Sequence, residues 1–127
     1  MNDQPNAAQL VAAVRDFLEQ VALPKLDGHA AFHARVAVNA RAIVERELAL
    51  GADLDAAERA RLRALLGSDG TLETQNRELC RRLRAGQIGL DTPGLALHLR
   101  ETTLAKLAVD QPGYSGYRRA LERRRSP

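Results

Sequence analysis

The sequence contains few of the residues that build β-sheets or disulfide-bonded scaffolds. Aromatic residues make up 3% of its 127 residues, tryptophan is absent, and there is one cysteine, Cys80. A single cysteine cannot form an internal disulfide, which agrees with a reducing compartment, so we expect a cytoplasmic protein. Leu, Ala and Val must supply the core, and Ala, Leu, Arg and Glu are strong helix formers. The composition therefore favours helices.

Long apolar runs are also missing. No stretch approaches the roughly 20 apolar residues that cross a bilayer, and the first residues, MNDQPNAAQ, lack the basic and apolar regions of a secretory signal. We expect a soluble protein that does not span a membrane. With 45% hydrophobic and 28% charged residues, the composition is that of a globular chain, and the length is typical of one domain.

Positive charge is concentrated at the C-terminus. The net charge is +3, and residues 118–127 (RRALERRRSP) hold five Arg and one Glu, so the rest of the chain is close to neutral. Such a tail can anchor a polyanion such as nucleic acid. It can also be a solvated chain end, which is the interpretation we favour. We therefore divide the chain into a helical bundle domain, residues 1–113, and a basic C-terminal tail, residues 114–127.

Apolar periodicity predicts five helical segments and no strand. Short connections between such helices favour antiparallel neighbours, so the expected fold is an all-α, single-domain, up-and-down bundle of about five helices. A further short helix is predicted around residues 117–124, in the tail. The five main segments cover about residues 7–21, 28–50, 56–66, 71–85 and 93–109.

Residues that start or stop helices set these bounds. Asn6 and Gln9 have the spacing of a capping box at the start of the first helix. Gly51 is expected to end the second helix, and Asp55 to cap the third. Thr92 is expected to cap the fifth helix, with a proline in the first helical position.

The most informative polar residue is Asn39, which falls in the middle of the apolar stripe of the predicted second helix. A buried amide without a hydrogen bond costs about 1–3 kcal/mol, so Asn39 either satisfies a backbone group inside the core or lines a pocket. In the second interpretation Arg35 and Arg46 flank it with guanidinium groups suited to a carboxylate or phosphate, and Asn76 meets it across the core. The candidate ligand-binding residues are therefore Arg35, Asn39, Arg46 and Asn76.

Metal binding and catalysis have little support. His29 and His33 lie four residues apart on one side of a helix, but two ligands do not make a zinc site. Cys80 falls on the apolar face of the fourth helix, where a buried and inert thiol is expected. No HExxH, GxSxG or glycine-rich phosphate loop occurs. We expect no metal, no cofactor and no enzymatic activity, although an enzyme that works with surface groups would leave no motif.

Nucleic-acid binding is a further class to consider. The third helix, the GSDG turn and the fourth helix could form a helix-turn-helix, with arginines at positions 77, 81, 82 and 84. These arginines are spread around the helix, however, and the third helix carries acidic residues of its own. A solvated helix face explains the pattern as well, so we do not favour a nucleic-acid partner.

Three runs carry a resemblance to a known family. NAAQLVAAVRDFL, FHARVAVNARAIVEREL and HLRETTLAKLAVDQP occur in this order around a leucine-rich third helix. Together they resemble a bacterial family of short, uncharacterised all-helical proteins, classed as a domain of unknown function. The resemblance covers about residues 4–114, and its most specific part is residues 32–48. It transfers no catalytic residue to this chain.

The resemblance also implies a setting. Members of the family are often encoded near acyl-CoA dehydrogenases and near kinases resembling aminoglycoside phosphotransferases. We therefore expect a non-catalytic accessory or interaction module that partners one of these enzymes. The apolar fifth helix leaves room for a homodimer seam. The alternative is a binder of a small anionic molecule, for example a CoA thioester.

Overall fold

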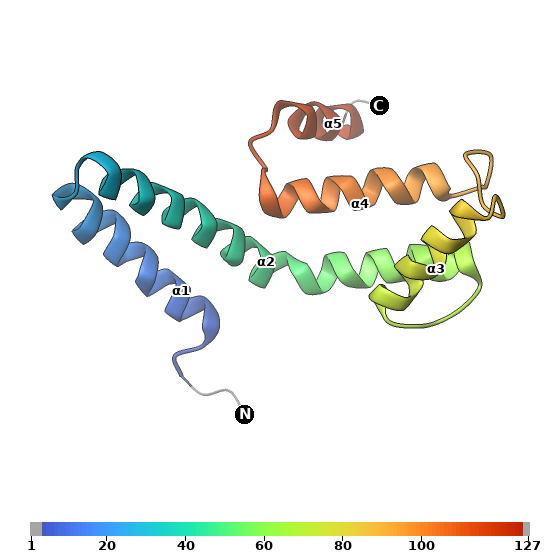
Figure 1. Ribbon diagram of the computed structural model, residues 1–127, viewed down its shortest axis with the longest axis horizontal. Coiled ribbons are helices and arrows are strands. Elements are labelled where there is room, and N and C mark those ends of the chain that lie inside the picture. Colours follow the sequence, from blue (N-terminus) through green and yellow to red (C-terminus); the bar gives the residue numbers. More distant parts are fainter. Residues whose placement is uncertain (1–3, 126–127) are drawn as a thin grey trace. The chain divides into compact units, whose positions relative to one another are not determined.

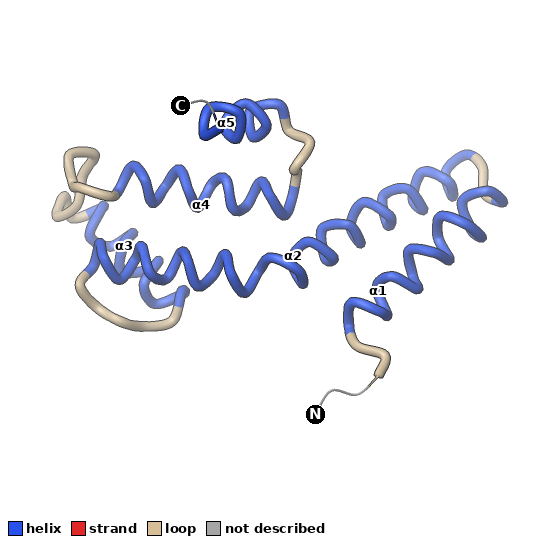
Figure 2. The backbone as a smooth tube through the Cα atoms, turned by 180° about the vertical axis from the view of Figure 1, so that it is seen from behind, coloured by secondary structure: helices blue, strands red, loops and turns tan. Residues whose placement is uncertain are grey.

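The structure, a computed structural model, describes residues 4–125, and most of these residues are helical (Figure 1). Five α-helices and no strand occur within this range, which confirms the all-α prediction (Figure 2). The elements in chain order are α1 (Ala7–Asp16), the π-helical turn η1 (Phe17–Ala22), the 3₁₀ turn η2 (Leu23–Lys25), α2 (Gly28–Leu66), α3 (Leu72–Arg84), α4 (Leu95–Asp110) and α5 (Ser115–Arg125).

The chain is organised in two compact units. The first ends at Ala49 and the second begins at Leu50, so the boundary falls within α2. The first unit therefore holds α1, the two short turns and the N-terminal half of α2. The second holds the C-terminal half of α2 together with α3, α4 and α5. The expected division into residues 1–113 and 114–127 stays a prediction.

α2 corrects the prediction of two separate helices at 28–50 and 56–66, because it is one helix of 39 residues. Gly51 does not end it, and Asp55 does not cap a new helix. A glycine inside a helix costs only about 1 kcal/mol relative to alanine, and the flanking Leu, Ala, Glu and Arg residues are strong helix formers that outweigh it. The helix ends instead before Gly67, whose φ of 68° is the left-handed conformation that commonly follows the last turn of a helix.

The first unit is a helical hairpin in which α1 and the first half of α2 lie side by side (Figures 1 and 2). The predicted capping box is confirmed, because the side chain of Asn6 accepts from the Gln9 amide at 2.9 Å and that of Gln9 accepts from the Asn6 amide at 2.8 Å. Ion pairs connect α2 to the preceding elements: Arg15 of α1 lies 3.7 Å from Glu45, and Arg41 lies 3.9 Å from Glu19 of η1. The α-helical part of the first segment ends at Asp16, earlier than predicted, and continues as η1.

The hairpin buries very little apolar surface. Among residues 4–49, the buried hydrophobic residues are two alanines, Ala31 and Ala34. Most large apolar side chains of this unit lie on the surface, with Phe17 and Phe32 both 57% exposed. The exposed set in this unit is Leu10, Val14, Phe17, Val21, Leu26, Phe32, Val36, Ile43, Val44 and Leu48.

The second unit contains the apolar core. Helices α2, α3 and α4 and the loop between α3 and α4 each contribute to it, and Leu62 and Leu95 are fully buried. Thr71 caps α3, because its side-chain hydroxyl accepts from the Thr74 amide at 3.2 Å, which is the usual hydrogen bond of an N-cap residue. The core residues are Leu62, Leu66, Leu79, Ile88 and Leu95.

The start of α4 differs from the prediction. Gly94, with a φ of 88°, is the N-cap residue, and Leu95 is the first residue of the helix. Thr92 does not cap the helix, because its hydroxyl accepts from the Gly89 amide at 3.0 Å and so closes a turn in the preceding loop. A threonine serves a turn as readily as a cap, which the sequence pattern alone does not separate.

Candidate functional site

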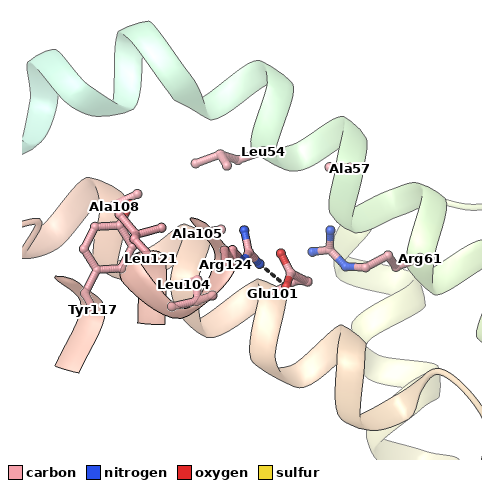
Figure 3. Close-up of a pocket in the computed structure, with 10 residues that line it drawn as sticks. All are labelled: Leu54, Ala57, Arg61, Glu101, Leu104, Ala105, Ala108, Tyr117, Leu121 and Arg124. Carbon is pink, nitrogen blue, oxygen red and sulfur yellow. Dashed lines mark hydrogen bonds and ion pairs between the residues drawn. The ribbon is translucent and has the colours of Figure 1, made fainter. Parts of the chain in front are cut away.

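A small cleft lies in the second unit where α2, α4 and α5 meet (Figure 3). Its volume is about 190 Å³. Each helix presents one face to it: the lining residues of α2 and α5 recur at intervals of three or four, and those of α4 include pairs at the same spacing. The lining residues are Leu54, Ala57 and Arg61 from α2, Glu101, Leu104, Ala105 and Ala108 from α4, and Tyr117, Leu121 and Arg124 from α5.

Three charged side chains meet at one end of this cleft. Arg61, Glu101 and Arg124 point toward one another (Figure 3). Arg124 donates a hydrogen bond to the Glu101 carboxylate, and this bond lowers the pKa of Glu101 and raises that of Arg124. The three groups together carry one net positive charge, because two guanidinium groups face one carboxylate.

Arg61 is less well partnered than Arg124. Its Nη2 donates to the Thr102 hydroxyl at 3.4 Å, which is long for a hydrogen bond. Its Nε is buried and has no hydrogen-bond partner among residues 4–125. A buried donor without an acceptor is costly, so Arg61 has the least satisfied hydrogen-bonding groups of the three charged residues.

His98 is the buried histidine of this region. It lies on α4 one turn before the cleft residues, and its side chain is only 2% exposed. Burial lowers its pKa, and the positive charge of Arg61 lowers the pKa further while Glu58 opposes the shift. The imidazole is therefore neutral near pH 7.

The lowered pKa of His98 makes stability depend on pH. As the pH falls below about 6.5, the unfolded chain takes up this proton before the folded chain does, so stability is lost from that pH downward to the folded-state pKa. When the pH is lowered from 7.5 to 5.5, we expect the free energy of unfolding to fall less for His98→Gln than for the native chain, as measured by urea unfolding. His29→Gln, at an exposed position, serves as the control. Parallel profiles for His98→Gln and the native chain would contradict this account.

The predicted ligand residues are distributed over both units. Arg35 and Asn39 are exposed on α2 and Arg46 is half-buried there, all in the first unit. Asn76 lies on α3 in the second unit, and its amide donates to the Glu58 carboxylate at 2.8 Å. Asn39 is thus not the buried core amide that was one of the two interpretations. Periodicity identifies an apolar face, but it does not tell whether that face is covered.

The structure also bears on the predictions for Cys80, for the His29 and His33 pair and for membrane-spanning segments. Cys80 is exposed, so the expectation of a buried thiol is wrong. The rings of His29 and His33 lie 4.4 Å apart, and residues 4–125 contain no group of three or more His, Cys, Asp or Glu side chains placed to hold a metal. None of the helices within that range is long and apolar enough to span a membrane.

Arginines of α3 are paired with acids of the same helix. Arg77 lies 2.6 Å from Glu73, and Arg81 and Arg82 each donate to Glu78 at 2.7 Å. These hydrogen bonds lower the pKa of Glu78 to about 2. The pairing agrees with the interpretation of this helix as a solvated, charged face.

The cleft was not found from the sequence, because its third wall comes from the predicted tail. Residues at positions 117, 121 and 124 recur at helical spacing, which could have indicated a packed face. Tyr117 and Leu121 are half-buried, and Arg124 is paired with Glu101. The five arginines of the segment instead predicted a solvated basic tail.

Fold and site together define a small all-α protein with a helical hairpin and a helical core unit. The chain belongs to the family described as a domain of unknown function, DUF6285, whose family model matches residues 24–114. The match begins later than the expected residue 4, so α1 and η1 lie outside it. No curated protein and no solved structure matches the chain.

Proposed function

We propose that this protein is a non-catalytic interaction module that binds a partner protein through the apolar surface of its hairpin. The observation that carries the proposal is the exposure of most large apolar side chains of the first unit, where Ala31 and Ala34 are the buried hydrophobic residues among residues 4–49. Burying apolar surface contributes about 25 cal/mol per Å². A monomeric protein rarely leaves a large contiguous apolar patch in water unless something binds there.

The hairpin has a groove in which such a partner can dock. This hairpin groove has a volume of about 270 Å³ and is lined by Leu10, Val11, Val14, Arg41 and Val44. Exposed apolar residues recur along α1 and η1 at positions 10, 14, 17 and 21, of which the first two line the groove. Spacing of four, three and four residues is the pattern that packs against another helix. The partner surface that fits is therefore an apolar helix face.

The family resemblance supplies the partner class. We propose an acyl-CoA dehydrogenase-like enzyme, or a kinase resembling aminoglycoside phosphotransferases, encoded near this protein in bacteria and acting with it in the cytoplasm. The module would bring no chemistry of its own to this enzyme. A second copy of the chain is the other occupant to consider, and the exposed leucines of α4, Leu97 and Leu99, lie where the homodimer seam was expected.

The test is a measurement of complex formation with purified components. The full chain is mixed with each of the two enzymes, and the mass of the resulting species is measured by light scattering after size exclusion. We expect a stable complex with one enzyme. If the chain stays apart from both, the proposed partner is wrong, and a dimeric mass for the chain alone would then indicate that a second copy is the partner.

Binding of a small anion at the predicted residues remains a second proposal. The side chains of Arg35 and Asn39 are exposed on neighbouring turns of α2, so a ligand such as a CoA thioester can reach them. Arg46 belongs to the same unit, whereas Asn76 is already bonded to Glu58 in the other. This proposal therefore rests mainly on the two exposed residues.

A further inference from the structure

We propose that the cleft between α2, α4 and α5 binds a short, linear aliphatic monocarboxylate, whose carboxylate pairs with Arg61 and whose chain lies on the apolar end of the cleft. This inference goes beyond the proposed interaction function and does not depend on it. It concerns the second unit alone, where all the lining residues lie.

One additional negative charge would neutralise the charged end of the cleft, which is formed by Arg61, Glu101 and Arg124. Glu101 and Arg124 are hydrogen-bonded and neutralise each other, which leaves the charge of Arg61 in excess. Arg61 also has a buried Nε without an acceptor and only a long bond to Thr102. The Nε is shielded from the cleft, so the oxygens of a bound anion would accept from the two Nη groups of this guanidinium.

The chemistry of the cluster favours a carboxylate over a phosphate. A carboxylate is planar and carries a single charge, so it matches both the guanidinium fork and the one excess positive charge. A phosphate monoester carries up to two charges at neutral pH. The Glu101 carboxylate in the same cluster repels that second charge.

The other end of the cleft is apolar and small. Its walls are leucine and alanine side chains and the Tyr117 ring (Figure 3). Ala105 and Ala108 leave the space on α4 that larger side chains would fill. A volume of about 190 Å³ is below the 300–1,000 Å³ that is typical of drug-sized ligands. At roughly 30 Å³ for each water-sized group, the cleft takes about six such groups. Hexanoate, with one carboxylate, four methylene groups and one methyl group, has six groups when the carboxylate is counted as one, and therefore matches this size.

The probe for this proposal is hexanoate, titrated into the full chain and followed by isothermal calorimetry and by NMR chemical shifts. We expect saturable binding of hexanoate, and binding at least about tenfold weaker for hexanol and for hexyl phosphate. Arg61→Gln is expected to weaken hexanoate binding by at least about tenfold. The matched control is Arg63→Gln on the same helix, because Arg63 is exposed and pairs with the exposed Asp69 outside the cleft.

A second variant separates the site from a general effect on folding. Ala108→Leu fills the apolar end without changing any charge, so it is expected to weaken hexanoate binding at least about tenfold if the chain occupies that end. The proposal is overturned if hexanoate does not bind saturably, if hexyl phosphate binds as well as hexanoate, or if both Arg61→Gln and Ala108→Leu bind it like the native chain. None of these results would affect complex formation through the hairpin.

Discussion

Replacing Leu62 with alanine is expected to lower the free energy of unfolding of the second unit by about 2–5 kcal/mol. Leu62 is 0% exposed and lies at the centre of the core that α2, α3 and α4 share. Its truncation removes buried methyl groups and leaves a cavity that the surrounding leucines fill only in part. Because a small domain has about 5–15 kcal/mol of stability in total, this single change removes a large fraction of it.

Urea unfolding followed by circular dichroism measures this loss. The matched control is Leu90→Ala, because Leu90 lies in the loop before α4 and is 87% exposed. That substitution is expected to change stability by less than about 0.5 kcal/mol. Equal effects of the two substitutions would contradict the placement of Leu62 at the centre of the core.

Replacing both Val14 and Val44 with serine is expected to weaken complex formation by the hairpin at least about tenfold. The two valines come from different helices and both line the hairpin groove, where they are 52% and 46% exposed. Full burial of an apolar side chain of this size contributes about 1.5–3 kcal/mol. Because each valine is already about half covered, a partner buries only the remainder, and losing both contacts should weaken binding at least about tenfold, since each 1.4 kcal/mol is a factor of ten.

Complex formation with the partner enzyme is measured for this double variant beside Leu97→Ser. Leu97 is similarly exposed, but it lies on α4 in the second unit. The serine variants in the hairpin should keep their helical content, because neither valine is buried. If the double variant binds the enzyme as the native chain does, or if Leu97→Ser removes binding equally, the hairpin groove is not the binding surface.

Local helix signals predicted much of the fold. The capping box at Asn6 follows from hydrogen bonds that Asn6 and Gln9 make within a few residues of the chain. The predictions that Gly51 ends a helix and that Thr92 caps one were wrong, because the same residue types also occur in other local structures. A glycine can be carried inside a long helix by its neighbours, and a threonine hydroxyl can close a turn instead of capping a helix.

The candidate sites were harder to predict, because burial depends on contacts between distant segments. The apolar stripe around Asn39 predicted a covered face, yet Phe32 and Ile43 on the same stripe are exposed. The opposite error concerns the C-terminal segment. Its arginines suggested a solvated tail, whereas Tyr117 and Leu121 pack into the cleft beside α4. Periodicity finds faces, and only the tertiary contacts decide which face is covered.

The most direct test of the proposed interaction is site-specific photo-crosslinking. A photo-reactive amino acid is placed at Val14 in the hairpin groove or, as the control, at Leu97 on α4, and each protein is irradiated with the purified acyl-CoA dehydrogenase-like or kinase-like enzyme. The account predicts a crosslink to one of these enzymes from position 14 and none from position 97. No crosslink from position 14, or equal crosslinks from both positions, would contradict it.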